Sequence, residues 1–144
     1  MNKKIKLITF DLDDTLWDNH PTIIKAEVDT RKWIEGQVGE VEWGDLNDFL
    51  ELREDLIKGD KSIAWDISKL RKEIFRIKLS HVNPTELRDE IVNKAFEIFI
   101  SKRHEVTFFD GVKKCISDLS EKYSLGILTN GNADIYKFDI GKYL

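Results

Sequence analysis

The sequence predicts an α/β protein in which a helical segment is inserted between two strands of a parallel sheet. Two short apolar runs, over residues 5–10 and 124–128, are rich in β-branched residues and have the composition of buried strands. About four amphipathic helices are predicted between them, and a further helix directly precedes the second run. This order of strand, helices and strand is typical of parallel sheets, whose strands need long helical connections.

The first two inserted helices are predicted from proline, glycine and capping residues. Pro21 suits a first helical position, and Gly36 and Gly39 are expected to interrupt the helix that follows. The apolar face of this helix is predicted to consist of Ile24, Val28 and Ile34. Asp45 is expected to cap the second helix, which Gly59 ends.

The remaining helices are predicted from apolar spacing. A stripe at intervals of four and three residues indicates one continuous helix, and it consists of Ile63, Ile67, Leu70, Ile74 and Ile77. In residues 83–86, asparagine, proline and glutamate have the order of an N-cap, a first helical proline and a returning acid. Cys115 is predicted to be buried on the apolar face of the helix before the second strand. A last helix is predicted over residues 133–143.

Composition excludes several classes of protein. The 144 residues are 41% hydrophobic and 35% charged, as in soluble globular domains. No apolar run is long enough to span a membrane, and the net charge of −4 gives no general attraction for nucleic acid or anionic lipid. We therefore expect no nucleic-acid partner, no membrane partner and a cytoplasmic location. The single cysteine excludes an internal disulfide.

The loop after the first strand carries three acids, Asp11, Asp13 and Asp14. No lysine or arginine lies between Phe10 and Ile24, so repulsion among these carboxylates needs a cation, and oxygen ligands suit Mg²⁺. Alternation along an extended segment would place Asp11 and Asp13 on one side. One carboxylate could attack phosphorus while the second acts as acid and base. The alternative is that the acids only stabilise a turn and cap a helix.

A second polar loop follows the second predicted strand. The Thr129 hydroxyl can donate a hydrogen bond to a phosphoryl oxygen, and the backbone N–H groups of Asn130 and Gly131 can form part of an anion cradle. The alternative is an ordinary Asn-Gly turn. The carboxyl ends of parallel strands are where open α/β sheets bind ligands, so the two loops together favour a phosphate site.

Residues 8–16 resemble the first motif of the haloacid dehalogenase (HAD) superfamily, and residues 128–131 resemble its second motif. The resemblance implies a HAD-like Rossmannoid core formed by residues 1–17 and 107–144, with an inserted helical C1 cap over residues 18–106. Residues 14–19 and 129–133 are most similar to the subfamily I phosphatases of small metabolites. These include enzymes that act on FMN or on the riboflavin precursor 5-amino-6-(5-phospho-D-ribitylamino)uracil.

The resemblance also implies roles for individual residues. Asp11 would be the nucleophile and an Mg²⁺ ligand, and Asp13 would be the general acid/base, with its backbone carbonyl on the metal. Thr129 would bind the transferring phosphoryl group of a small phosphorylated metabolite such as FMN. Asn130 is predicted to bind the same group through its backbone N–H, from the turn described above. In this family the second acid separates phosphatases from dehalogenases, so Asp13 argues against halide chemistry.

Two further motifs of the family, a lysine and an acidic pair, have no match here. Only 13 residues follow Gly131, and Lys137 and Lys142 come too early for the third motif. The family's sheet also has more strands than the two predicted, with the first at its centre. We therefore expect the N-terminal part of a phosphatase, with an incomplete core and little or no activity as an isolated chain. A variant of this hypothesis is a split enzyme completed by a second chain.

Two alternatives remain open at this point. A HAD phosphotransferase or mutase would pass the phosphoryl group from Asp11 to a sugar, and a non-catalytic fragment would act only by binding. The basic residues Lys69, Arg71 and Lys72 are interpreted as a solvated helix face, with contact to an anionic substrate as the alternative.

Overall fold

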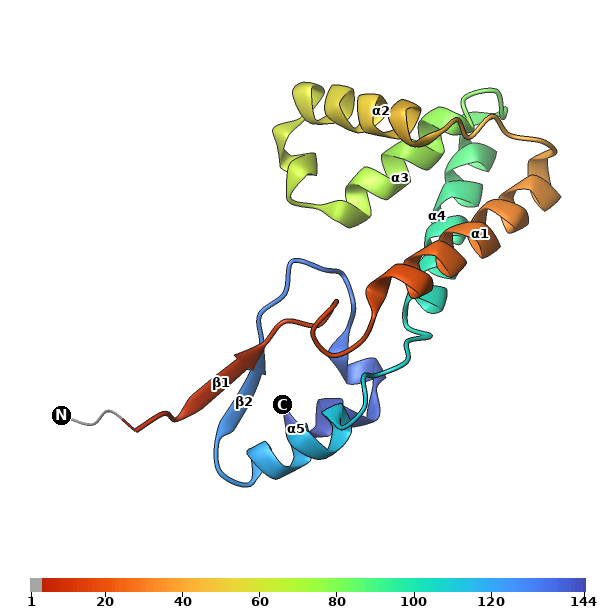
Figure 1. Ribbon diagram of the computed structural model, residues 1–144. Coiled ribbons are helices and arrows are strands. Elements are labelled where there is room, and N and C mark those ends of the chain that lie inside the picture. Colours follow the sequence, from red (N-terminus) through yellow and green to blue (C-terminus); the bar gives the residue numbers. More distant parts are fainter. Residues whose placement is uncertain (1–3) are drawn as a thin grey trace. The chain divides into compact units, whose positions relative to one another are not determined.

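The computed structural model describes residues 4–144 and confirms the α/β class. The chain runs through β1 (Leu7–Phe10), α1 (Asn19–Val38), α2 (Leu46–Gly59), α3 (Ile67–Lys78), α4 (Thr85–Arg103), α5 (Val112–Ser120) and β2 (Ser124–Ile127) (Figure 1). Short 3-10 helices occupy Lys61–Ala64, Ile135–Lys137 and Asp139–Tyr143. Two compact units result. One contains Lys102–Leu144 with the described part of residues 1–25, and the other is Ala26–Ser101.

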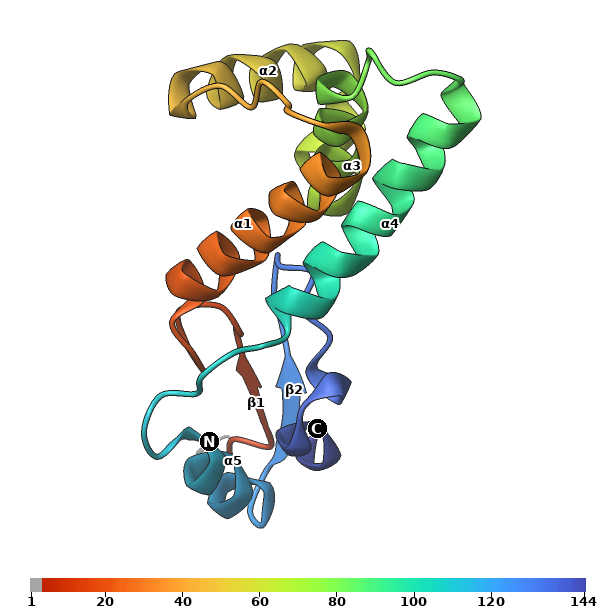
Figure 2. The ribbon, with the colours of Figure 1, turned by 90° about the vertical axis from the view of Figure 1, so that its right-hand side faces the viewer.

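The sheet of the first unit has two strands among the described residues. β1 and β2 are parallel, with Leu7 opposite Ser124 and Phe10 opposite Ile127 (Figure 2). The prediction of a buried first strand is wrong: Leu7 is 58% exposed, and only Ile8 and Phe10 are half-buried. Within the described chain β1 has one neighbouring strand, so one of its edges and part of one face stay open to solvent.

The core of the first unit lies between the sheet, the loop after β1, α5 and the C-terminal segment. Its buried members are Leu12, Leu16, Trp17, Ile116, Leu125, Ile135 and Ile140. Cys115 is exposed, against the prediction, because the short α5 fully buries only Ile116. The last predicted helix is also wrong: extended backbone at Phe138 separates two 3-10 turns.

Of the predicted apolar face of helix α1, only Ile34 is buried. Ile24 and Val28 are 50% and 58% exposed, while Ala26, Thr30 and Ile34 are fully buried at intervals of four residues. Thr30 is tolerated there because its hydroxyl donates to the Ala26 carbonyl at 2.7 Å. The helix also continues through Gly36 and ends at Val38, before Gly39 with φ +85°.

The capping prediction for α2 is confirmed. The Asp45 side chain accepts from the backbone N–H groups of Asn47 and Asp48, and the Asp48 side chain accepts from the Asp45 N–H. This reciprocal capping box satisfies donors that the first helical turn leaves without partners. Gly59 is the last residue of the helix, as predicted.

The long apolar stripe is divided between two elements. Ile63 lies in the 3-10 helix Lys61–Ala64, and α3 begins at Ile67 after its N-cap Asp66. Ile63 still packs with Leu70 and Ile74, as the stripe suggested. The prediction of one continuous helix is wrong, because Ile63 lies in a separate element. Helix α4 begins at Thr85, one residue after Pro84. No helix in the described part of the chain is long and apolar enough to cross a membrane.

Candidate active site

The two predicted loops leave the sheet at the same edge. Phe10 and Ile127 are the last residues of their strands and lie opposite each other. The Leu128 N–H extends this pairing by donating to the Phe10 carbonyl at 2.9 Å. The acidic loop that starts at Asp11 and the second loop that starts at Leu128 therefore begin side by side, as expected for the carboxyl ends of parallel strands.

The acidic loop presents Asp11 and Asp13 away from the core. Leu12 between them is buried with 1% exposure, whereas Asp11 is exposed and Asp13 is half-buried. The Asp11 carboxylate accepts the Leu12 N–H at 2.7 Å. Asp14 has φ +58° and accepts the Asn19 N–H at 2.9 Å, so this third acid serves the turn and the start of α1.

Asp13 is held at both carboxylate oxygens. Its Oδ1 accepts the Trp17 indole N–H at 3.0 Å, and its Oδ2 lies 2.5 Å from Nη2 of Arg103. Trp17 is fully buried and packs against the rings of Phe108 and Phe138. Arg103 is 2% exposed. Arg103 was not predicted from the sequence, because it lies 90 residues from Asp13 and no basic residue lies within the acidic loop itself.

The second loop approaches the Asp13 carboxylate through Gly131. A Cβ atom at Gly131 would lie 2.7 Å from Asp13 Oδ2, 3.0 Å from Arg103 Nη2 and 3.4 Å from Thr129 Oγ1. Side chains of the two loops thus meet with no room for a methyl group. The Gly131 N–H donates to Thr129 Oγ1 at 3.1 Å, and Asn130 is exposed. Thr129 is therefore brought to the acidic loop, while the Gly131 N–H is engaged inside its own loop.

The donor set at this edge consists of oxygens. Asp11 offers an exposed carboxylate, and the backbone carbonyls of the loop are hard donors of the type that Mg²⁺ prefers. The Asp13 carboxylate is already occupied by Trp17 and Arg103. No cluster of three or more histidine, cysteine or acidic side chains within residues 4–144 could hold a metal ion. These residues therefore fit Mg²⁺ as an open site, in which the protein supplies only a few oxygen ligands.

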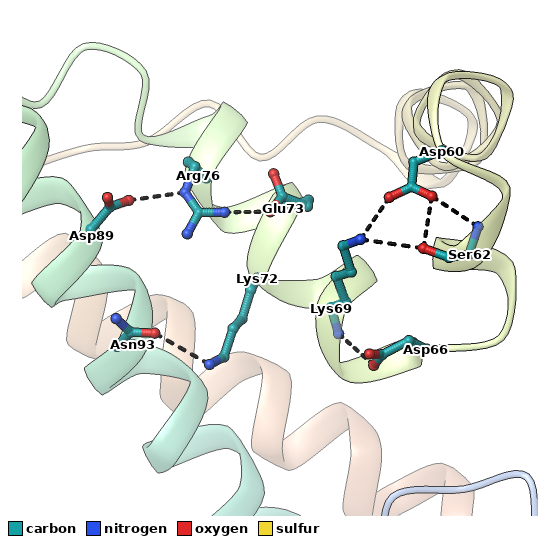
Figure 3. A network of polar contacts seen from close by, with 9 residues as sticks. All are labelled: Asp60, Ser62, Asp66, Lys69, Lys72, Glu73, Arg76, Asp89 and Asn93. Carbon is teal, nitrogen blue, oxygen red and sulfur yellow. Dashed lines mark hydrogen bonds and ion pairs between the residues drawn. The ribbon is translucent and has the colours of Figure 1, made fainter.

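Four basic residues of α3, Lys69, Arg71, Lys72 and Arg76, contact neighbouring side chains. Lys69 Nζ lies 2.6 Å from Asp60 Oδ2, Lys72 donates to Asn93 at 3.2 Å, and Arg76 donates to Asp89 at 2.9 Å (Figure 3). Hydrogen bonds from Lys69 and Ser62 lower the pKa of Asp60 from 3.8 to about 2. Arg71 pairs with Glu27 and lies over the Phe99 ring. Lys69, Arg71 and Lys72 are therefore half-buried and engaged by other side chains, which differs from the solvated face that was predicted.

The whole described chain from residue 5 onward matches one family. Residues 5–144 fit the family described as haloacid dehalogenase-like hydrolase, and the chain belongs to that family of hydrolases. The resemblance seen in the two sequence motifs is thereby confirmed.

Particular relatives refine this class. The chain is 26% identical, over 141 residues, to the 5-amino-6-(5-phospho-D-ribitylamino)uracil phosphatase YigB of Escherichia coli K12. That alignment covers 97% of this chain and 59% of YigB. The likeness to riboflavin-pathway phosphatases is confirmed by this match.

Solved structures also match. A 2-haloacid dehalogenase from Pseudomonas syringae pv. tomato is 34% identical, with a TM-score of 0.88, over 98% of this chain and 62% of that one. The HAD hydrolase YfnB from Bacillus subtilis, solved bound to magnesium, is 16% identical with a TM-score of 0.57 and shares the fold over 99% of this chain and 63% of its own. The chain thus spans about three-fifths of the length of these relatives.

Proposed function

We propose that this chain carries the phosphoryl-transfer site of a Mg²⁺-dependent phosphatase that acts on a small phosphorylated metabolite through an aspartyl-phosphate. The observation that carries the proposal is the meeting of the Asp11–Asp13 loop with the Thr129–Gly131 loop at one sheet edge, in a hydrolase of the HAD family. This reaction needs an exposed carboxylate, a second acid in a fixed position and a hydroxyl donor, and all three lie at this end of the sheet.

In this proposal Asp11 is the nucleophile. Its carboxylate oxygen bonds to phosphorus while the bond from phosphorus to the leaving oxygen breaks. Asp13 gives a proton to that oxygen, then takes one from the water that attacks the aspartyl-phosphate and releases inorganic phosphate. Each Asp13 oxygen accepts one hydrogen bond from Trp17 or Arg103, so each retains a second lone pair that can carry the proton.

Thr129 and the loop backbone would hold the phosphoryl oxygens. Because Thr129 Oγ1 accepts from the Gly131 N–H, its own hydroxyl hydrogen is left to donate to a phosphoryl oxygen. The backbone N–H of the exposed Asn130 is the second donor assigned to this task. Mg²⁺ would be held by the Asp11 carboxylate and the Asp13 backbone carbonyl, and would neutralise charge between the nucleophile and the phosphate.

The proposed substrate class follows the named relative. YigB is a phosphatase of 5-amino-6-(5-phospho-D-ribitylamino)uracil, so that compound is the first candidate here. FMN, which the sequence resemblance suggests, is the second, and the proposed location of the enzyme is the cytoplasm. The dehalogenase among the structural neighbours raises halide release as a second activity to be measured. The 144 residues hold no match for the family's lysine and second acidic pair, so we expect slow turnover by this chain alone.

The proposal is tested by phosphate release from p-nitrophenyl phosphate and FMN, with the chain in molar excess so that one slow turnover is detected. We expect release that requires Mg²⁺, is lost in Asp11→Asn and is kept in Asp14→Asn. Asp14 is a matched control because it lies in the same loop, and asparagine can keep both its positive φ and its bond to Asn19.

Each other outcome contradicts a stated part of the proposal. Release that persists in Asp11→Asn, or that ignores Mg²⁺, overturns the assigned nucleophile or metal. Chloride release from chloroacetate with no phosphate release would identify a dehalogenase. Transfer of the phosphoryl group to an added sugar, without inorganic phosphate, would identify a phosphotransferase. Absence of every reaction, including transfer of a phosphoryl group to Asp11, would favour a chain that acts only by binding.

A further inference from the structure

We propose that Arg103 is a positioning residue that holds the general acid/base Asp13 and the second loop in one arrangement. The proposal rests on the function proposed above, because it concerns the same two loops. Arg103 is the last residue of α4, and its guanidinium reaches both loops at once.

The guanidinium joins residues that are distant in sequence. Nη2 contacts Asp13 Oδ2 in the acidic loop at 2.5 Å, and Nε donates to Asn132 Oδ1 in the second loop at 2.6 Å. The neighbouring His104 accepts the Asp134 N–H at Nε2 at 2.9 Å. The end of α4 is therefore tied to the second loop twice and to the acidic loop once.

The burial of the Arg103 guanidinium is unfavourable for the stability of the fold. Arg103 is 2% exposed, and its third nitrogen, Nη1, is buried with no hydrogen-bond partner among the described residues. A buried ion pair does little for stability compared with apolar packing, and an unpaired buried donor adds a penalty. The guanidinium does provide a rigid, planar set of hydrogen-bond donors, which fixes the orientation of the side chains that accept from it.

Asp13 gains a fixed orientation from two opposite contacts. Arg103 holds Oδ2 while the buried Trp17 indole holds Oδ1, so rotation of the carboxylate would break at least one hydrogen bond. Gly131 closes over the Oδ2 contact, since a Cβ atom there would lie within 3.0 Å of both Asp13 and Arg103. Asp11, in contrast, is held only by the adjacent Leu12 N–H among the contacts at its carboxylate that the structure shows.

The first test reads the contact without activity. The Trp17 indole N–H resonance in ¹H–¹⁵N NMR spectra reports on Asp13. The Ser124 amide, which donates to the Lys6 carbonyl at 3.0 Å in the sheet of the same unit, is an internal control for folding. We expect Arg103→Met to shift the Trp17 resonance and leave that of the Ser124 amide in place. Arg103→Lys, which keeps the charge but loses the planar donors, should also shift it, and the matched control Lys102→Met should not.

A second variant covers the case in which Arg103→Met does not fold, as shown by loss of the Ser124 amide resonance from its position in the wild-type spectrum. Gly131→Ala keeps the arginine but pushes its methyl group against Asp13 Oδ2, so the same Trp17 shift is expected. A Trp17 resonance that stays unchanged in the folded Arg103 or Gly131 variant overturns the proposal.

The kinetic readout separates this proposal from the proposed function. With FMN and the chain in molar excess, we expect Arg103→Met to lower the maximal single-turnover rate about 100-fold, with the chain concentration that gives half of that rate nearly unchanged. This is the size of effect that a small misplacement of a reacting group can have. If the wild-type chain releases phosphate and Arg103→Met matches it, the positioning role fails alone. If the wild-type chain releases no phosphate, the positioning role falls together with the proposed function, even where the Trp17 shift is seen.

Discussion

At the scale of single residues, the two aspartates of the acidic loop have different surroundings. Asp11 is exposed and has a short contact with its own loop, whereas Asp13 is held by a buried tryptophan and a buried arginine. A nucleophile must approach phosphorus, and an acid/base must keep its direction towards the leaving oxygen and then towards water. The difference in surroundings agrees with the division of roles proposed here.

The leaving group decides how much the loss of Asp13 matters. We expect Asp13→Asn to reduce phosphate release from FMN about 10²–10⁴-fold, because the alkoxide leaving group needs a proton. Loss of p-nitrophenolate needs no proton, so its first release should keep the wild-type rate while hydrolysis of the aspartyl-phosphate slows. The measurement is a nitrophenol burst followed by a slow phase. Equal losses with both substrates at every phase would contradict the acid role of Asp13.

The sequence was sufficient to predict the loops but not their buried partner. Asp11, Asp13 and Thr129 follow the strand ends directly, so their place at one edge could be predicted from local pattern. Arg103 pairs with Asp13 through tertiary packing, and a terminal helix arginine normally suggests only a favourable interaction with the helix dipole. The only sequence feature that singled out Arg103 is its position just before the connection to α5, and that position does not predict that the side chain is buried.

At the scale of elements, the capping residues and the apolar spacing in the sequence predicted the contacts of the helices better than the residues at which the helices begin and end. The capping box of Asp45 and Asp48 was predictable because it needs only local backbone geometry. The buried face of α1 was not, because it uses Ala26 and Thr30 rather than the large apolar residues Ile24 and Val28. Hydrophobicity ranks threonine low, but an internal hydrogen bond allows its burial.

The Asp60–Lys69 pair gives a pH prediction at this scale. Asp60 has a pKa of about 2, so its protonation lies below the usual value of 3.8. The pair's contribution to stability is complete above about pH 4 and is lost as the pH falls towards 2. We expect the Asp60 carboxyl ¹³C titration to have its midpoint near 2, and to move towards 3.8 in Lys69→Met. An unchanged midpoint in that variant, at low salt, would contradict the pairing seen in Figure 3.

At the scale of the whole molecule, the chain has separate cores. The first unit packs around Trp17 and Ile116, whereas Phe75 and Leu79 belong to a cluster within Ala26–Ser101. The order of elements in the sequence, a strand followed by helices and a second strand, predicted this α/β architecture. The open face of β1 could not be predicted, because a short apolar run is typical of a buried strand. Local pattern does not tell how many neighbours a strand has.

Substitutions in the two cores should act locally. We expect Phe75→Ala to destabilise its unit by about 3–5 kcal/mol and Ile116→Ala to destabilise the other by about 2–5 kcal/mol, from lost burial and cavity formation. Urea unfolding followed at the Trp43 and Trp17 indole resonances separates the effects, since Trp43 contacts Phe75 and Trp17 packs with Ile116. Equal shifts of both probes in each variant would show one cooperative unit instead.

The central claim is that Asp11 accepts the phosphoryl group at the edge where the two loops meet. The most direct measurement is mass spectrometry of acid-quenched Asp13→Asn chain after incubation with p-nitrophenyl phosphate and Mg²⁺, followed by peptide mapping. We expect one phosphoryl group on Asp11, absent without Mg²⁺ and absent when Asp11→Asn is added. No phosphorylated peptide, or a phosphoryl group on another residue, would contradict it.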